Sequence, residues 1–344
     1  MTVFNEDLNR LIDVQFPYAQ LSGKVILVTG ASGQLGRYLC SILAEKAEQF
    51  GFNVVAMSRS GERLLEVFGR YTGIDHFTIY PHDVNEQLDD RYYDIIIHCA
   101  SNTHPSLYSN DPVGTILTNT MGLNNLINRV KKGGRLVYLS SVEVYGENRG
   151  DTDKFDEGYC GYIDCNTVRA GYNESKRLGE SLCQAYGKQR GLDFVIVRLS
   201  RTYGPSLDPE DTKAISQFIF AAVKGEDIVL RSQGDQLYSY CYSSDAVDAI
   251  LYLLFYGKTG EAYNVAGLNS DHTLNEVARM ISEATGVNIV HKEPDKDEFF
   301  GYSTATKAVL DISKIRKLGW EPRVTMREGL ERTVNHLRSS DLSL

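Results

Sequence analysis

The chain has 344 residues, of which 42% are hydrophobic and 24% charged, an ordinary globular composition. Its 36 Lys and Arg against 45 Asp and Glu leave a net charge of −9, which argues against a nucleic-acid backbone or an anionic membrane surface as the main partner. A local basic pocket for a phosphorylated small molecule is compatible with this balance. Because single cores stop growing at about 250–300 residues, we expect one large domain with a smaller second lobe.

Cysteines and histidines give no sign of a disulfide framework or a metal site. The six cysteines are scattered and lack the CxxC spacing of zinc or redox sites, so we expect reduced thiols. Four histidines between residues 76 and 104 lack the helical spacing of metal ligands, and we expect no metal. The N-terminus does not resemble a secretion signal, and the longest apolar runs have the length of strands. We therefore expect a soluble, cytoplasmic protein.

In chain order, residues 1–22 are interpreted as an N-terminal extension, a short amphipathic helix with a linker. From residue 24, short apolar strands alternate with helices. The expected strands are 24–30, 53–58, 77–84, 93–100, 134–141 and 193–200, and the expected helices include 36–50, 122–132 and 172–189. Strands that are apolar throughout are typical of a parallel sheet covered on both faces. The pattern predicts an α/β fold with a Rossmann-type, doubly wound parallel sheet of about seven strands.

Three glycines, Gly30, Gly33 and Gly36, follow the first strand and open the next helix. Glycines at such a turn allow close approach of the backbone to a pyrophosphate, and the helix N-terminus offers free N–H groups to the anion. A flexible turn is the alternative interpretation, but the strand before and the helix after favour dinucleotide binding. The loop residues expected at the cofactor are Gly30, Ser32, Gly33, Gln34, Leu35 and Gly36.

The strand–helix alternation weakens after Pro205. We therefore predict a cofactor-binding domain over residues 23–205, to which part of 238–268 returns. A smaller α/β lobe that holds the substrate is expected over 206–237 and 269–344. The active site is then expected at the carboxyl ends of the strands, between the two parts.

The spacing Gly-x-x-Gly-x-x-Gly after Thr29 resembles the short-chain dehydrogenase/reductase family, and specifically its extended, nucleotide-sugar-modifying branch. Further segments match the family in order over nearly the whole chain: HDV at 82–84, HCAS at 98–101, SSVEVYG at 140–146, YNESK at 172–176, RLSRTYGP at 198–205, YNV at 263–265 and LGWEP at 318–322. The resemblance implies an adenine site at Asp83 and Val84, and a pyrophosphate and ribose site at Ala100 and Ser101. It also implies a homodimer formed through two helices of the cofactor domain.

The choice between NAD and NADP depends on the end of the second strand. A carboxylate there would bind the ribose 2′-hydroxyl of NAD, but the sequence has Ser58, Arg59 and Ser60. An arginine can pair with the 2′-phosphate of NADP, so NADP is favoured. Arg59 could instead stack on the adenine, and NAD stays open.

Tyr172 and Lys176 are four residues apart and share one face of a helix. An ammonium and the positive nicotinamide would lower the phenol's pKa from its usual value of about 10, so that Tyr172 can act as a base. Ser141, at a strand end, can hold the substrate oxygen. Together they predict hydride chemistry at a sugar hydroxyl, with Tyr172 and Lys176 also contacting the cofactor. An ordinary surface pair is the alternative.

The resemblance further implies that Glu143 faces the sugar as a second acid–base group. Glu here is typical of hexose 4,6-dehydratases and uronate decarboxylases, whereas many 4-epimerases carry a small or apolar residue. Val142 stands where glucose 4,6-dehydratases place an Asp, although mannose-type dehydratases lack that Asp too. Arg169, three residues before Tyr172, resembles the decarboxylase pattern. A purely structural role for Glu143 is the alternative.

The expected substrate lobe departs from the family pattern at two positions. Tyr238 stands where most members have an arginine for the nucleotide diphosphate, and Arg201 stands where an Asn is usual. Our hypothesis is that the positive charge has moved, so that Arg201, with Lys213 or Arg231, meets the substrate's phosphates. Thr103 is also expected at the substrate.

The leading hypothesis is an enzyme that oxidises C4 of a nucleotide-linked sugar, acts through the 4-ketone and returns the hydride, with no net redox change. The outcome would be dehydration, decarboxylation or epimerisation. A second hypothesis is an NADPH-dependent reductase of a 4-keto nucleotide sugar, which Arg59 favours and which has less use for Glu143. A third, a cofactor-binding regulator without chemistry, is disfavoured by the complete set of Ser141, Tyr172 and Lys176.

Overall fold

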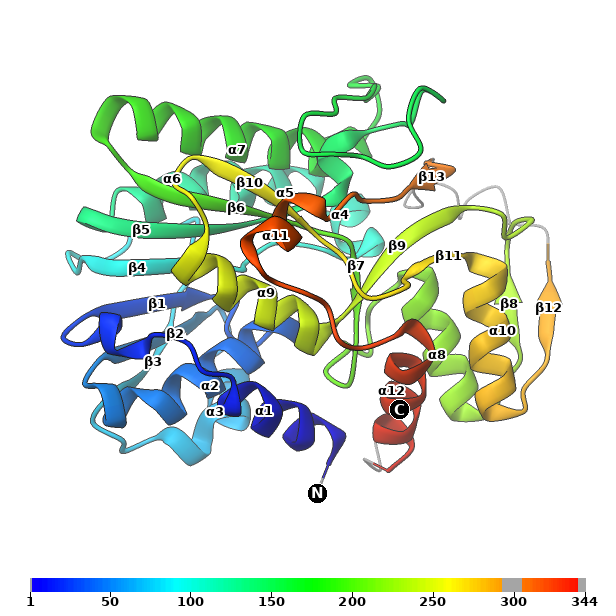
Figure 1. Ribbon diagram of the computed structural model, residues 1–344, viewed down its shortest axis with the longest axis horizontal. Helices are drawn as coiled ribbons and strands as arrows, with labels where there is room; N and C mark the ends of the chain where they lie inside the picture. The colour runs from blue at the N-terminus through cyan, green and yellow to red at the C-terminus, as the bar shows by residue number, and fades with distance from the viewer. Residues whose placement is uncertain (1, 293–304, 340–344) are drawn as a thin grey trace.

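A seven-stranded, all-parallel sheet forms the larger part of the molecule, as seen in a computed structural model that describes residues 2–292 and 305–339 (Figure 1). The strand order is β10–β6–β5–β4–β1–β2–β3. The strands are β1 (Val25–Thr29), β2 (Asn53–Ser58), β3 (Phe77–Pro81), β4 (Tyr93–His98), β5 (Val130–Ser141), β6 (Asp193–Leu199) and β10 (Glu261–Val265). The predicted Rossmann-type, doubly wound fold is confirmed.

Helices cover both faces of this sheet. Ile26 and Val28 of β1 belong to the core beneath α2 (Gln34–Phe50), α3 (Gly61–Phe68) and α9 (Ser243–Tyr256). Leu27, between them, belongs to the core on the other face, with α6 (Leu123–Ile127) and α7 (Ala170–Arg190). Successive residues of a strand point to opposite faces, so a strand buried on both sides is apolar throughout.

The helix expected over 122–132 is shorter than predicted. The helical chain of α4 (Pro105–Asn110), α5 (Pro112–Leu117), the π-helical turn η3 (Thr118–Gly122) and α6 ends at Ile127. Residues 130–132 belong instead to β5, because Val130 pairs with Tyr93 of β4. The register then shifts before Arg135 pairs with Ile95, and Gly133, with φ +77°, lies in this irregular stretch.

A second, smaller region packs at the carboxyl edge of the sheet (Figure 1). Its central strand β9 pairs with β7, β11 and β13, while β8 pairs with β12. Its elements are β7 (Arg201–Tyr203), α8 (Ala214–Lys224), β8 (Ile228–Leu230), β9 (Leu237–Tyr242), β11 (Asp271–Thr273), α10 (Leu274–Thr285), β12 (Ile289–His291), β13 (Lys307–Ala308) and α12 (Met326–Ser339). It has its own apolar core, centred on α8, α10 and α12. The short α11 (Ser313–Leu318) lies between β13 and α12 in sequence but contacts β10 of the large sheet.

The N-terminal helix α1 (Val3–Asp13) ties the two regions together. Its buried Asp7 accepts hydrogen bonds from Tyr242 Oη at 2.6 Å and from Arg332 Nη2 at 2.8 Å. These partners come from β9 and α12, so one carboxylate joins three segments that are far apart in sequence. Within the described residues, no helix is long and apolar enough to cross a membrane.

Candidate active site

A large pocket of about 930 Å³ opens at the carboxyl ends of the parallel strands and is also lined by the smaller region. The structure brings every site residue predicted from sequence to its wall. These residues are Gly30, Ser32, Gly33, Gln34, Leu35, Gly36, Ser58, Arg59, Asp83, Val84, Ala100, Ser101, Thr103, Ser141, Glu143, Tyr172, Lys176, Arg201, Lys213, Arg231 and Tyr238. Their proximity makes one site possible, and their individual roles follow from local geometry.

The glycine loop forms a backbone cradle, a space that side chains at its glycine positions would occupy. Gly30 has a φ of +63°, and a Cβ atom there would lie 2.8 Å from the backbone nitrogen of Ala100. A Cβ on Gly36 would lie 2.2 Å from the carbonyl oxygen of Gly30. The helix that follows, α2, begins without a side-chain hydrogen bond at its N-cap, Gly33. Free N–H groups at a helix start beside bare backbone fit the pyrophosphate of a dinucleotide.

The end of β2 carries hydroxyl and guanidinium groups to the same end of the pocket. Ser58 Oγ lies 2.8 Å from Ser32 Oγ, which couples this strand end to the glycine loop. Arg59 is exposed on the pocket wall, and Arg63 of α3 lines the wall as well. These groups are suited to a phosphate more than to a pair of neutral ribose hydroxyls. Asp83, the expected adenine residue, also lines the pocket, where one of its carboxylate oxygens accepts a hydrogen bond from the backbone of Asn85.

Tyr172 and Lys176 project from one face of α7 toward the ends of β4 and β5. Burial raises the pKa of Tyr172 to about 12, although a hydrogen bond from Ser141 and the charge of Arg169 act to lower it. The Lys176 ammonium donates to the carbonyl oxygen of Leu139 at 2.9 Å, and burial lowers its pKa to about 8. The cation that lowers the pKa of Tyr172 in this structure is therefore Arg169, whereas sequence reasoning assigned that role to Lys176.

A buried polar chain behind Tyr172 was not foreseen from the sequence. Ser101 Oγ donates to Asn119 Oδ1 at 2.9 Å, and Asn119 Nδ2 donates to Ser175 Oγ at 3.0 Å. Ser175 in turn donates to the carbonyl oxygen of Tyr172 at 2.9 Å. Asn119 is fully buried in the π-helical turn η3, a local irregularity that no sequence spacing announces. This chain fixes the start of α7 relative to the cofactor side of the pocket.

Glu143 lies between two arginines. It belongs to the short 3₁₀ helix η4 (Val142–Tyr145), which follows β5 directly. Its Oε2 is 2.8 Å from Arg169 Nη2, and its Oε1 is 3.5 Å from Arg201 Nη2. Asn173 Nδ2 donates to Glu143 Oε2 at 3.3 Å. Burial raises the pKa of Glu143, but the opposing effect of Arg169 and Arg201 is larger. The pKa of Glu143 therefore lies below its usual value, and the carboxyl is held in its ionised form.

The two positions that depart from the family pattern are in direct contact. The Arg201 guanidinium lies 3.5 Å from the centre of the Tyr238 ring, a cation–π stack between β7 and β9. Among the described atoms, Arg201 Nη1 is buried and has no hydrogen-bond partner. The positive charge at position 201 is thus placed over position 238 and beside Glu143. Lys213, by contrast, is paired with Asp211 at 2.6 Å.

Comparison with known sequences finds relatives that match most of this chain. The sequence profile of the NAD dependent epimerase/dehydratase family matches residues 26–266. UDP-glucuronic acid decarboxylase 3 of Arabidopsis thaliana is 33% identical over 314 residues, which cover 89% of this chain and 86% of that protein. UDP-glucuronic acid decarboxylase 1 of Xenopus tropicalis is 29% identical over 345 residues, covering 97% of this chain and 77% of that protein.

Comparison with solved structures gives the same fold. A dTDP-glucose 4,6-dehydratase of Streptomyces venezuelae with NAD bound has a TM-score of 0.77 at 25% identity, covering 92% of this chain and 97% of that one. A UDP-glucuronic acid 4-epimerase of Bacillus cereus, in complex with UDP-glucuronic acid and NAD, has a TM-score of 0.75 at 20% identity, covering 91% and 99%. The resemblance inferred from the sequence motifs is confirmed.

Proposed function

This chain belongs to the NAD dependent epimerase/dehydratase family, and from that premise we propose that it decarboxylates a nucleotide-linked uronic acid, with UDP-glucuronic acid as the first candidate. It is an enzyme of nucleotide-sugar metabolism that acts through a 4-keto intermediate. The finer assignment is supported by one observation, the carboxylate of Glu143 held between Arg169 and Arg201.

The charge on Glu143 favours decarboxylation over dehydration. Loss of water from C5 and C6 of a 4-keto sugar needs a base at C5 and a protonated acid at the C6 hydroxyl. Glu143 is held ionised, and its neighbour Val142 is apolar, so neither offers that proton. Loss of CO₂ from C5 of a 4-keto uronic acid needs no such acid, because the C5–C6 bond breaks heterolytically.

The residues divide the steps among them. Tyr172 takes the proton of the C4 hydroxyl as C4 becomes a ketone, and a bound NAD(P) supplies the oxidising and reducing equivalents at C4. The carboxylate then leaves as CO₂, and its bonding electrons pass to C5 and the C4 oxygen as an enolate. Ser141 and Tyr172 hydrogen-bond that oxygen, a proton from water is added to C5, and Tyr172 returns its proton when C4 is reduced. The product is a nucleotide-linked pentose.

Position favours Arg201 as the partner of the sugar carboxylate. It lies 3.5 Å from Glu143, beside the residues assigned to the chemistry, and its Nη1 is buried and unpartnered among the described atoms. This location replaces the sequence-based hypothesis that Arg201 meets the phosphates. Lys213 and Arg231, elsewhere on the pocket wall, are then the candidates for the diphosphate, with Thr103 at the sugar.

Incubation of the purified protein with UDP-glucuronic acid tests this function. We expect CO₂ release and a UDP-pentose product without net accumulation of reduced cofactor, and denatured protein should release a dinucleotide that was not added. Glu143→Gln should reduce the rate while cofactor binding is retained, because it removes the anion that pairs with Arg169 and Arg201 and so holds Arg201 at the sugar. If the protein is purified empty, consumes NADPH with a 4-keto sugar and is unaffected by Glu143→Gln, it is the reductase instead.

For the cofactor, we propose a preference for NADP over NAD. Arg59 and Arg63 both line the end of the pocket where β2 ends, and Ser58 replaces the acidic residue that would hold the ribose of NAD.

The described cysteines are all free thiols, which supports a reducing, cytoplasmic location.

We also propose a homodimer formed through α5, η3 and α7. Large apolar side chains are exposed along this part of the molecule: Val113, Ile116, Leu117, Met121, Val168 and Leu178. The helices α5 and α7 pack against each other, so these side chains share one side of the sheet (Figure 1). Leu178→Arg with Met121→Arg should convert the dimer to monomer in light scattering, whereas Leu65→Arg on α3, across the sheet, should not.

A further inference from the structure

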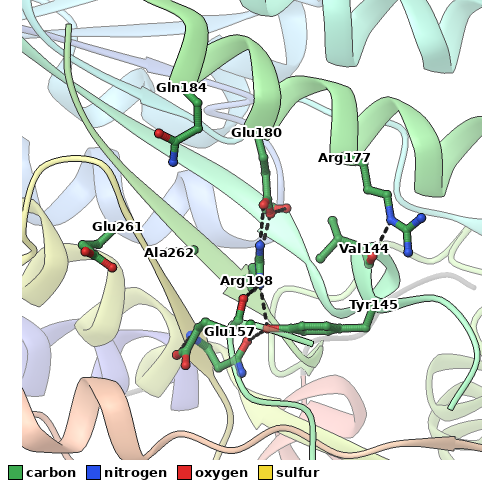
Figure 2. A network of polar contacts seen from close by, with 12 residues as sticks. Val144, Tyr145, Glu157, Arg177, Glu180, Gln184, Arg198, Glu261 and Ala262 are labelled. Atoms are coloured by element: carbon green, nitrogen blue, oxygen red, sulfur yellow. Dashed lines mark hydrogen bonds and ion pairs between the residues drawn. The ribbon is translucent and has the colours of Figure 1, made fainter. Parts of the chain in front are cut away.

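A buried ion pair lies one helical turn beyond Lys176 (Figure 2). Glu180 of α7 is 9% exposed, and its two carboxylate oxygens accept a forked pair of hydrogen bonds from Arg198 of β6. The distances are 2.9 Å from Nε to Oε1 and 2.6 Å from Nη2 to Oε2. Ser140 Oγ donates to the same Oε1 at 2.6 Å. Glu180 thus holds the residue before Ser141 as well as the arginine.

Arg198 is itself fixed by three other segments, as Figure 2 shows. Its Nη1 donates to Tyr145 Oη at 3.0 Å and to the carbonyl oxygen of Glu157 at 2.8 Å. Tyr145 Oη donates to Asn264 Oδ1 of β10 at 2.6 Å. Because η4, the segment at Glu157 and, through Tyr145, β10 all contribute, the guanidinium has little freedom to move, and neither has the carboxylate that it holds.

Burial of Lys176 works against its charge. Its hydrogen bond to the carbonyl oxygen of Leu139 and its position 5.1 Å from the centre of the Tyr138 ring act in favour of the charge. Burial lowers the pKa of Lys176 to about 8, while Cys99 and Glu180 act in the opposite direction. A further fall of this pKa by about one would leave much of the residue neutral near pH 7.

The other titratable groups that face Lys176 are neutral near pH 7. Burial lowers the pKa of His98 in β4 to about 3. Burial raises the pKa of the Cys99 thiol and of the Tyr172 phenol to about 12, and it raises the pKa of Tyr138 well above its usual value. Among the described groups that act on Lys176, Glu180 is therefore the anion.

We propose that Glu180, held in place by Arg198, is a positioning residue that keeps Lys176 in its charged form and fixes the end of β5 at Ser140 and Ser141. The role rests on the proposed function, because it serves Ser141 and the cofactor beside Lys176, both of which act in the proposed reaction. It places a determinant of Lys176 charge outside the pocket wall, one turn farther along the same face of α7.

The variant Glu180→Gln keeps the shape of the side chain and removes the charge. After removal of any co-purified dinucleotide, we would measure the NADH dissociation constant from pH 6 to pH 9. A protonated Lys176 supports binding of the anionic cofactor, so affinity should fall as pH rises through the pKa of Lys176. We expect the midpoint of this fall to move to lower pH by about one unit.

Two further variants separate this role from a structural one. Glu174→Gln removes a partly exposed carboxylate of the same helix, which is paired with Arg177 at 3.3 Å, and should leave the midpoint unchanged. Glu180→Gln with Arg198→Gln removes both charges of the pair, so that no unpaired charge stays buried. This double variant should be more thermally stable than Glu180→Gln. The midpoint of its fall in NADH affinity should still lie at lower pH than in wild type, although by a smaller amount. This double variant decides the matter if the single variant does not fold.

A midpoint within about 0.3 unit of wild type in a folded variant that lacks the Glu180 charge would overturn the proposal. A midpoint that returns to wild type in the double variant would also overturn it, since the effect would then come from the unpaired arginine. NADH binding does not depend on the sugar. If wild type binds NADH but releases no CO₂, the proposed decarboxylation fails while the proposal on Glu180 is still decided.

Discussion

The two ends of the pocket recognise their ligands by different means. At the cofactor end, the glycine loop contributes bare backbone to the wall, and Gly30 and Gly36 leave space that no side chain could share. At the sugar end, charged side chains form the wall, with Glu143 held between Arg169 and Arg201. Cofactor binding therefore depends on glycines that leave room for the ligand, whereas sugar binding depends on ion pairs between side chains.

This difference decides how each end can vary. The glycine loop that forms the cofactor cradle is a few consecutive residues long, so a substitution at one of its glycines can abolish cofactor binding. The sugar end draws on η4, α7, β7 and β9, and a charge can move from one element to another while the total is kept. The stack of Arg201 over Tyr238 is such a rearrangement, since the guanidinium arises from β7 and lies over the side chain of β9.

The largest effect that would test this contrast is expected at the cradle. In Gly36→Val, the new Cβ would lie 2.2 Å from the carbonyl oxygen of Gly30 and 2.7 Å from Ala31 Cα, and backbone cannot move aside as a flexible side chain can. We expect a loss of NADH affinity of at least about 100-fold, which corresponds to about 3 kcal/mol. Fluorescence titration with NADH measures it.

Gly69→Ala is the matched control for the cradle. Gly69 lies just after α3, and a Cβ added to it would have no neighbouring atom within 4 Å and would meet no positive φ. Its replacement should therefore leave NADH affinity within about 2-fold of wild type. Equal losses in Gly36→Val and Gly69→Ala would mean that general destabilisation, and not the cradle, sets cofactor affinity.

An intermediate effect is expected at the sugar end. Arg201→Gln removes the cation assigned to the sugar carboxylate, and a charge-assisted contact contributes about 1.5–3 kcal/mol, so we expect KM for UDP-glucuronic acid to rise by about 10- to 100-fold. Binding of UDP-glucose, which has no carboxylate, should change by less than about 3-fold. Calorimetric titration with the two nucleotide sugars measures both.

Lys213→Gln is the counterpart variant for the diphosphate. Because UDP-glucose and UDP-glucuronic acid share the diphosphate, this change should weaken the two ligands equally. If Arg201→Gln also weakens both ligands equally, Arg201 belongs at the phosphates, as the sequence hypothesis had it, and the assignment of the sugar carboxylate to it is wrong.

The sequence predicted those features whose physical cause is local. Continuous apolar runs gave the parallel strands, and the glycine spacing placed the cradle, because each depends on a few adjacent residues. The end of the helix near residue 127 was missed, since a pairing of Val130 with Tyr93 across the sheet overrides a helical pattern. Asn119 gave no signal, because its role depends on Ser101 and Ser175 being brought to it by the fold.

The residues of the sugar end could be predicted from the sequence, but their contacts with one another could not. Glu143 and Arg201 were singled out as departures or matches within motifs, yet 58 residues separate them, and their contact depends on η4 and β7 meeting beside β9. The ionised state of Glu143 follows from that contact, and so does the preference for decarboxylation. Chemistry that depends on paired charges needs the fold before it can be assigned.

The smallest effect is expected at the rim of the cofactor end. Here the two ends of the pocket differ least, because a charged side chain, Arg59, lies beside the glycine loop. Arg59 is exposed, and an exposed guanidinium contributes at most about 1–1.5 kcal/mol to a contact with the 2′-phosphate. We therefore expect Arg59→Ser to lower the ratio of NADPH to NADH affinity by about 10-fold, mainly through NADPH, and more strongly at low salt because exposed charges are screened. Fluorescence titrations with both cofactors at two salt concentrations measure the ratio. A wild-type protein that prefers NADH, with a ratio unchanged by Arg59→Ser, would place Arg59 on the adenine face and leave cofactor choice to the neutral groups Ser58 and Ser60.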